Sequence, residues 1–311
     1  MVKHYSLSYN SNHFYSTLMK KIIRFTFQVI VRIFFWIFRW GKDKVFLANL
    51  NNPDLPPGFF GLIIIKIFGI VHTINNYISD IYINYGLKKY SKWCDVHYSK
   101  EGRGYFNYED LNDNEKEKLY GKPKGRIEHF IINYNNIFSY IDGESFLDVG
   151  CGRGQNIKVL NGLFPNSLIK GFDVNKDAID VIKLGTKNIR NISIEYGNLK
   201  DKSYLTSFSN EQFDHIVMSH VFSFIINNSK EETRLLRQSI IDELIRVGRK
   251  NIFIQDGEAI LNIGKPKIVI EQLNRAHYWE SIIPYFNKHL ESGNITSIYS
   301  PESYGLIYNK Y

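Results

Sequence analysis

The stretch ESFLDVGCGRGQNIKVL, residues 144–160, places a carboxylate, Asp148, near the end of an apolar run. Three alternate glycines follow it: Gly150, Gly152 and Gly154. Glycine loops after strands often hold nucleotides, because a backbone without side chains can come close to a ligand. The stretch therefore predicts a strand, a binding loop and a helix in direct succession.

The sequence around this loop alternates apolar strand patterns with helical periods. The expected strands cover residues 144–149, 167–173, 191–196, 213–219 and 250–255, and the expected helices cover residues 126–141, 153–163, 175–184, 229–247 and 271–290. Such alternation predicts a parallel sheet with helices on both faces. The last two apolar runs, 295–300 and 304–311, are separated by Pro301, Glu302 and Ser303, which is a hairpin signal.

We therefore expect an α/β fold with a doubly wound, mostly parallel seven-stranded sheet and an antiparallel C-terminal hairpin. A helical, apolar N-terminal region should precede it. The expected division is a basic and apolar membrane-associating region over residues 1–97, a linker over 98–125 and a catalytic domain over 126–311.

The spacing of the loop argues against a phosphorylated ligand. A dinucleotide loop carries its third glycine where Gln155 stands here, and the lysine of a phosphate-binding P-loop is absent. Asp148 would repel a pyrophosphate but suits a positive amino group. Asp173 ends the next expected strand, 19 residues after Gly154, where a carboxylate accepts hydrogen bonds from both ribose hydroxyls. S-adenosylmethionine carries a ribose and a cationic end without a phosphate.

The run D-V-G-C-G-R-G at 148–154 resembles the first motif of class I S-adenosylmethionine-dependent methyltransferases. The resemblance extends over about residues 126–311. It includes Asp173 and the segments GNL (197–199), FDHIVMSHVFSFI (213–225) and ELIRVGRKNIFIQD (243–256). It implies a seven-stranded fold whose seventh strand is antiparallel, and methyl transfer from S-adenosylmethionine as the activity.

The resemblance also implies the cofactor-binding residues. The three glycines would let the backbone approach the methionine part, Asp148 would hold its ammonium group, partly through water, and Asp173 would bind the ribose. The implied set is Asp148, Gly150, Cys151, Gly152, Gly154, Asp173, Val174, Asn198 and Leu199. Asn198 and Leu199 would lie beside the adenine. The family often has an acid where Asn198 stands, but an asparagine carbonyl can still accept from the adenine amino group. Cys151 would be a small loop residue and not a nucleophile.

Two residues are candidates for a general base, which would assist a hydroxyl acceptor. His220 stands at the carboxyl end of the expected strand 213–219, where ligands of such sheets bind. It is also placed to pack simply beside the cofactor. Asp256 ends the following strand. His215 lies roughly 16 Å away along the strand and is not placed to act. No metal is expected, because Ser223 and Phe224 stand where metal-assisted relatives carry ligands.

The N-terminal region carries most of the net charge of +8, because residues 1–50 hold eight Lys and Arg and one acid. On a helical wheel of residues 20–40, one arc of about 80° holds Lys21, Arg24, Gln28, Arg32 and Arg39, with mostly apolar side chains around the rest. A helix lying in a membrane interface satisfies both faces. A tilted span and packing on the protein's own core are the alternatives. Residues 58–71 are too short to span and suit an interfacial or a buried helix.

These features predict a cytoplasmic protein that is peripheral on the inner face of a membrane. Two cysteines make no disulfide framework, and no secretory signal peptide is evident. We expect O-methylation of a membrane-associated acceptor such as a lipid-linked glycan, a lipid or a quinone precursor, so that the expected partner is a small-molecule or lipid-linked acceptor. The alternatives are methylation of a soluble small molecule, protein or nucleic acid, and a partner protein that binds S-adenosylmethionine without catalysis. No nucleic acid is expected, since the basic residues alternate with large apolar ones.

Overall fold

The computed structural model describes residues 77, 80–81, 83–88, 91–92, 94–96, 111–122, 127–256, 282–300 and 303–311. Its described strands form one sheet of order β3-β2-β1-β4-β5-β7-β6. The strands are β1 (Ser145–Val149), β2 (Leu168–Asp173), β3 (Ile192–Tyr196), β4 (Phe213–Ser219), β5 (Gly248–Gln255), β6 (Gly293–Ser300) and β7 (Ser303–Lys310). The first five pair in parallel, and β7 is antiparallel to both β5 and β6. The expected doubly wound sheet with its C-terminal hairpin is confirmed.

The strand order reverses at β1, which lies between β2 and β4. Asp148 is level with Gly171 of β2 on one side and with Val217 of β4 on the other. Ligands of open α/β sheets bind where the order reverses, beyond the carboxyl ends of the strands. The glycine loop that follows β1 therefore opens into the crevice that this topology creates.

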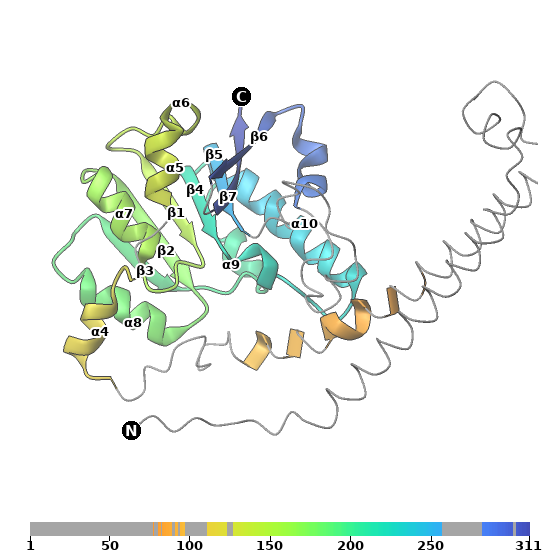
Figure 1. The fold of residues 1–311 in the computed structure, drawn as a ribbon, viewed down its shortest axis with the longest axis horizontal. Coiled ribbons are helices and arrows are strands. Elements are labelled where there is room, and N and C mark those ends of the chain that lie inside the picture. The colour runs from red at the N-terminus through yellow and green to blue at the C-terminus, as the bar shows by residue number, and fades with distance from the viewer. Residues whose placement is uncertain are drawn as a thin grey trace, which may run out of the picture. The chain divides into compact units, whose positions relative to one another are not determined.

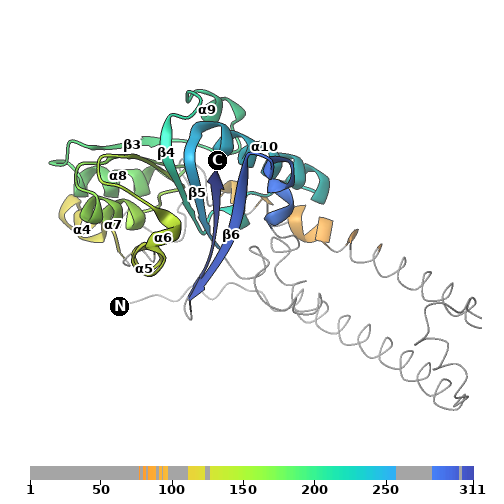
Figure 2. The same ribbon diagram turned by 90° about the horizontal axis from the view of Figure 1, so that it is seen from above.

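Helices cover both faces of the sheet, as Figures 1 and 2 show. On one face lie α5 (Ile127–Asn133), α6 (Asn135–Phe138), α7 (Gln155–Leu163) and α8 (Lys176–Gly185). On the other lie α9 (Lys202–Thr206), α10 (Lys230–Val247) and the 3-10 helix η3 (Ile283–His289). Because alternate strand residues point to opposite faces, Leu147 joins the core under α10, whereas Phe146 joins the core under α5.

Three elements differ in detail from the sequence expectation. The expected helix 126–141 is divided at Tyr134, whose φ of −128° and ψ of 35° are not helical. The helix after the glycine loop begins at Gln155, because Gly154 has a φ of 77° and caps it. Within the expected helix 271–290, the described part is the 3-10 helix η3, with Pro284 in its first turn; the rest lies outside the described residues.

The chain divides into two compact units, Met1–Asn75 and Asn76–Tyr311. The segments 20–40 and 58–71, for which interfacial helices are expected, lie outside the described residues. Within the second unit, residues 77–96 are helical where they are described, and they appear in orange in Figure 1 beside the start of α10. No helix in the described ranges is both long and apolar enough to cross a bilayer.

The described helical residues between 77 and 96 pack on the sheet domain through one face. Leu87 and Cys94 are buried against Ile226 of the loop that follows β4. Polar contacts fix both ends of the helix. The Asp80 carboxylate lies 2.5 Å from Lys230 Nζ at the start of α10, and the Asp95 carboxylate lies 2.5 Å from Lys200 Nζ after β3. This helix therefore touches the loops after both β3 and β4.

Candidate functional site

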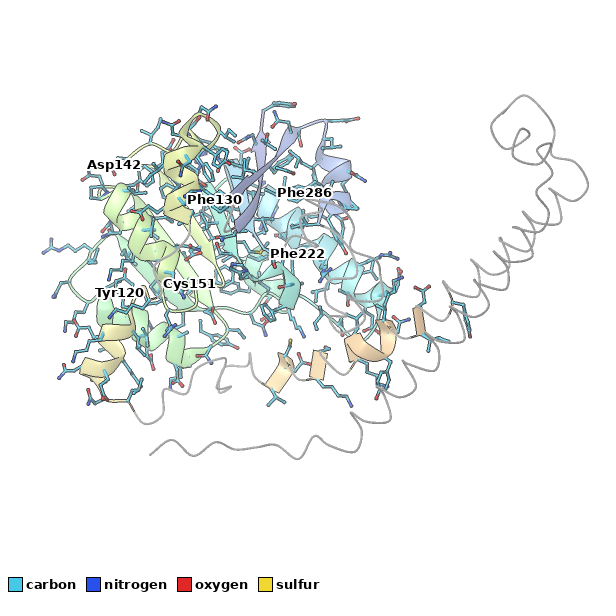
Figure 3. The ribbon with its side chains drawn as sticks, in the orientation of Figure 1. Tyr120, Phe130, Asp142, Cys151, Phe222 and Phe286 are labelled. Atoms are coloured by element: carbon cyan, nitrogen blue, oxygen red, sulfur yellow. The ribbon has the colours of Figure 1, made fainter. Side chains whose placement is uncertain are left out.

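The three glycines of the loop all need the left-handed backbone region. Gly150, Gly152 and Gly154 have φ values of 65°, 53° and 77°, which L side chains rarely adopt. A Cβ on Gly150 would come within 2.5 Å of the Val221 side chain, whereas a Cβ on Gly152 would meet only the Gln155 amide oxygen, at 3.3 Å. The backbone around Gly152 is thus open to a ligand. Figure 3 marks Cys151 in this loop.

Asp173 at the end of β2 holds the loop in place. Its Oδ2 accepts from the Gly152 backbone N–H at 2.9 Å, and its Oδ1 accepts from the Asn175 N–H at 2.8 Å. Burial raises the pKa of Asp173, although these backbone donors act against the rise. A carboxylate has about four acceptor positions, so Asp173 can keep both backbone contacts and still accept from ligand hydroxyls.

Asp148 is fully buried beneath the same loop, and its two oxygens differ. Oδ1 accepts from Asn156 Nδ2 at 3.1 Å, whereas Oδ2 is buried and has no hydrogen-bond partner among the described residues. Burial raises the pKa of Asp148 to about 7; the Asn156 contact opposes the rise and Asp173 adds to it. A buried carboxylate oxygen without a donor costs free energy. The site therefore fits a ligand that brings a cation or donor to Oδ2.

A chain of neutral polar side chains extends from Asp148 toward β5. Asn156, in the first turn of α7, also donates to Ser219 Oγ at 3.1 Å, and Ser219 donates to Gln255 Oε1 at 3.3 Å. Asn156 and Gln255 are both buried. Sequence reasoning missed this chain. The available signal was a pair of amides, Asn156 and Gln255, at positions where apolar residues are expected.

The expected adenine side is formed by the loop after β3. Asn198 Oδ1 accepts from the Lys200 N–H at 2.9 Å, and the Gly197 N–H donates to the Asp173 carbonyl at 3.0 Å. One lone pair of the Asn198 amide oxygen is thus already used within the loop, which leaves the other for a ligand. Leu199 is partly buried against the core below, and Val174 is partly exposed beside Asp173.

The two candidate bases occupy different environments. His220 is exposed directly after β4, has a φ of 55°, and donates its backbone N–H to the Gln255 carbonyl at 2.7 Å. Positive φ in a residue other than glycine is uncommon and often marks a functional position. Asp256 is buried, and its Oδ2 accepts from the Ser223 N–H at 3.0 Å within the 3-10 turn η1 (Phe222–Phe224). Asp256 thus fixes the loop that carries His220.

His215 and Cys151 are both buried away from solvent. His215 Nε2 lies 2.5 Å from Glu144 Oε2 at the amino end of the sheet. Burial raises the pKa of the Cys151 thiol well above its usual range, so the thiol is protonated near neutral pH and packs under the loop. No group of three or more His, Cys, Asp or Glu side chains that could hold a metal occurs in the part of the chain that the structure describes.

Residues 111–122 contact the glycine loop at their C-terminal end. They contain α4 (Asp113–Leu119), which begins with a capping box between Asn112 and Glu115 and packs on α8. After α4, the Gly121 N–H donates to the Arg153 carbonyl at 2.9 Å, and a Cβ on Gly154 would meet the Tyr120 ring at 2.7 Å. Tyr120, which Figure 3 labels, therefore lies against the glycine loop.

Residues 146–239 match the family model described as a methyltransferase domain. No curated protein matches the chain. Solved structures that align with it include a SAM dependent methyltransferase from Aquifex aeolicus, at 14% identity, 65% of this chain, 100% of that chain and a TM-score of 0.44. A geranyl diphosphate C-methyltransferase from Streptomyces coelicolor aligns at 14% identity, 60% of this chain, 75% of that chain and a TM-score of 0.43. A putative sarcosine dimethylglycine methyltransferase from Galdieria sulphuraria aligns at 13% identity, 60% of this chain, 85% of that chain and a TM-score of 0.42.

Proposed function

We propose that this chain, whose residues 146–239 match a methyltransferase domain, is a class I S-adenosylmethionine-dependent methyltransferase that O-methylates a membrane-associated acceptor such as a lipid-linked glycan, a lipid or a quinone precursor. In this proposal Asp148 binds the ammonium group of the cofactor and Asp173 binds its ribose. The observation that supports the cofactor assignment most directly is the buried, unpartnered Oδ2 of Asp148. The loop after β3, with Asn198 and Leu199, lies on the adenine side.

The cofactor supplies an activated methyl group bound to a sulfonium. When the methyl group is transferred, the rest of the cofactor leaves as a neutral thioether. The protein then has to align the acceptor oxygen with that methyl group, and orientation of this kind supplies much of the rate gain. In our proposal His220 accepts the hydroxyl proton as the carbon–oxygen bond forms. Asp256 acts through the loop backbone, by holding the Ser223 N–H, and does not itself take the proton.

The proposed acceptor class rests on the helix between residues 77 and 96. Its outer face exposes Tyr77, Ile81 and Tyr85, at 68%, 54% and 68% of their surface. Side chains four residues apart lie on one face of a helix. Tyrosine, with an apolar ring and a polar end, suits the boundary between water and lipid. The same helix contacts the loops after β3 and β4, so lipid contact along this face would lie near the acceptor side of the site.

The first experiment tests transfer and the proposed base. Purified full-length protein is incubated with S-adenosylmethionine labelled at the methyl group and with total lipid and glycan extracts. We expect label in the lipid-soluble fraction, and a loss of about 10²- to 10⁴-fold in His220→Ala, the usual range for removal of a general base. His129→Ala on α5 is the matched control and should keep full activity. Cofactor binding without transfer to any extract would instead favour the non-catalytic partner protein.

The second experiment tests membrane association by vesicle flotation. The variant Tyr77→Ser, Ile81→Ser, Tyr85→Ser should bind anionic vesicles several-fold more weakly than the wild type, because it loses apolar area at the interface. A matched variant changes equally exposed apolar residues elsewhere: Ile132→Ser, Leu168→Ser and Leu235→Ser. Equal binding by both variants would argue against lipid contact at this helix. A wild type that does not float would leave a soluble acceptor as the better assignment.

A further inference from the structure

The polar chain from Asp148 to Gln255 joins β1 to three other elements at the carboxyl edge of the sheet. Asn156 comes from α7, Ser219 from the end of β4 and Gln255 from the end of β5. Nδ2 of the Asn156 amide donates to Asp148 Oδ1 and to Ser219 Oγ, each at 3.1 Å. The Asn156 amide is therefore fixed by Asp148 and by Ser219. Because it donates to Asp148 Oδ1, Oδ2 is the Asp148 oxygen without a donor among the described residues.

We propose that Asn156, held by Ser219 and Gln255, is the positioning residue of the cofactor site, directing Asp148 Oδ2 at the cofactor's ammonium group so that binding releases a proton. The inference rests on the proposed function, since it assumes that Asp148 receives this ammonium group. Asn156 does not itself touch the cofactor in this arrangement. It acts through the orientation and the ionisation of Asp148.

The proton release follows from the surroundings of Asp148. Burial raises its pKa to about 7, so the ligand-free site is a mixture of carboxyl and carboxylate near neutral pH. The titratable or charged side chains on the neighbouring elements are Cys151 and Arg153 of the loop, Lys158 of α7, Lys170 and Asp173 of β2, Asp214 and His215 of β4, and His220 after β4. Asp173 adds to the rise through its negative charge, and the Cys151 thiol is protonated. An arriving ammonium favours the carboxylate, and the displaced proton passes to the buffer.

The structure also explains why a neutral amide suits position 156. An amide Nδ2 can donate to the carboxylate and to Ser219 together, which favours the charged form of Asp148 without adding a charge. An acid at this position would repel Asp148, and an apolar residue would leave both Asp148 oxygens without donors. Thus Asn156 limits the rise in pKa that burial imposes and keeps part of the site ionised before the cofactor arrives.

The test is calorimetric titration of the full chain with S-adenosylhomocysteine, which retains the amino and ribose groups, in buffers of different ionisation heat. For the wild type we expect affinity to rise between about pH 6 and pH 8, with release of roughly half a proton at pH 7. Asn156→Ala should bind about tenfold more weakly at pH 7 and shift the midpoint upward by about one pH unit. Asn161→Ala, on the same helix but away from the loop, is the matched control and should change neither.

Two further variants keep the test decisive. Asn156→Asp has nearly the same shape, so it should fold, and its added acid should move the binding midpoint up at least as far as Asn156→Ala does. Ser219→Ala should weaken binding by only about two- to threefold, because one support of Asn156 is lost. A wild type that binds with no pH dependence, or an Asn156→Asp variant with the wild-type midpoint, overturns the inference while the proposed function stands. A wild type that binds no ligand defeats the proposed function itself.

Discussion

At the carboxyl edge of the sheet Asp148 is buried, and one of its oxygens has no hydrogen-bond partner in the described part of the chain, whereas at the amino edge Glu144 uses both of its oxygens. Glu144 Oε2 contacts His215 Nε2 and accepts from the Ile141 N–H at 2.9 Å, and Oε1 contacts Lys250. Nearby, Asp214 accepts from the Ser145 N–H and hydroxyl, each at 2.9 Å. Both edges thus hold buried or partly buried carboxylates, but those at the amino edge have hydrogen-bond donors for their oxygens, whereas Asp148 at the carboxyl edge has a donor among the described residues for only one.

The direction of the pKa shifts separates the two edges. Burial raises the pKa of Asp148 and Asp173 at the carboxyl edge. Burial would also raise the pKa of Glu144 and Asp214, but their hydrogen bonds outweigh it and lower the pKa of both. The acids of the amino edge therefore stabilise the fold at neutral pH. Those of the carboxyl edge cost stability, which a ligand can restore.

Of the changes that test the difference between the two edges, Asp148→Asn should have the largest effect on cofactor affinity and stability. We expect the affinity for S-adenosylmethionine to fall at least about 100-fold, since the buried charge partner of the ammonium is lost. The ligand-free protein should gain about 1–3 kcal/mol of stability near pH 8, because a pKa raised from 3.8 to about 7 makes ionisation costly in the folded state. Calorimetry and urea unfolding measure the two effects. A ligand-free variant less stable than the wild type would contradict the assignment of Asp148 as a strained site.

Glu144→Gln should give the opposite result at the amino edge. Removing this charge leaves Lys250 without its carboxylate and breaks the contact with buried His215, so we expect a loss of about 2–4 kcal/mol of stability. The affinity for the cofactor should stay within about twofold of the wild type, since the site is at the other edge. Glu117→Gln is the control. It removes an exposed ion pair with Lys187, and exposed pairs contribute at most about 1 kcal/mol. A large fall in cofactor affinity would show that the two edges are coupled.

The dependence of the free energy of unfolding on acid pH should also differ between the two edges, with a smaller effect. Burial lowers the pKa of His215 from its ordinary 6.5, so the unfolded chain binds a proton that the folded chain does not, and stability falls as pH drops below about 6.5. Glu144 and Asp214 extend this loss at lower pH, as they are protonated. Asp148 acts the other way, because its raised pKa makes stability rise as pH falls from about 7. Asp148→Asn should therefore lose stability faster than the wild type on acidification, by up to about 1.4 kcal/mol per pH unit. The free energy of unfolding of both proteins is measured by urea unfolding at several pH values. If it depends on pH in the same way for the wild type and for Asp148→Asn, Asp148 does not have this stabilising effect on acidification.

Much of the carboxyl edge could be predicted from the sequence because its signals are local. The spacing from Asp148 through the glycines to Asp173 lies within one strand–loop–helix–strand unit, and the hairpin signal gave the antiparallel β7. The chain Asn156, Ser219 and Gln255 could not be predicted, because its contacts depend on the registers of β4 and β5 and on the rotation of α7. The contact of Leu87 with Ile226 likewise joins segments that only the folded structure brings together. The contact of the Asp256 side chain with the Ser223 N–H of η1 also joins residues that are far apart in the sequence.

The smallest expected effect concerns His220, where the backbone of the carboxyl edge is strained. A residue with a side chain in the left-handed region costs about 1–2 kcal/mol, and glycine avoids this cost while losing about 0.5–1 kcal/mol in unfolded-chain entropy. His220→Gly should therefore raise the free energy of unfolding by at most about 1 kcal/mol, while His220→Ala, which keeps the Cβ, should leave it within about 0.5 kcal/mol of the wild type. Both variants should lose methyl transfer if the imidazole takes the proton. Urea unfolding and the labelled-methyl assay separate the two roles. A His220→Gly variant that is less stable than His220→Ala would mean that the left-handed backbone at this position carries no net strain.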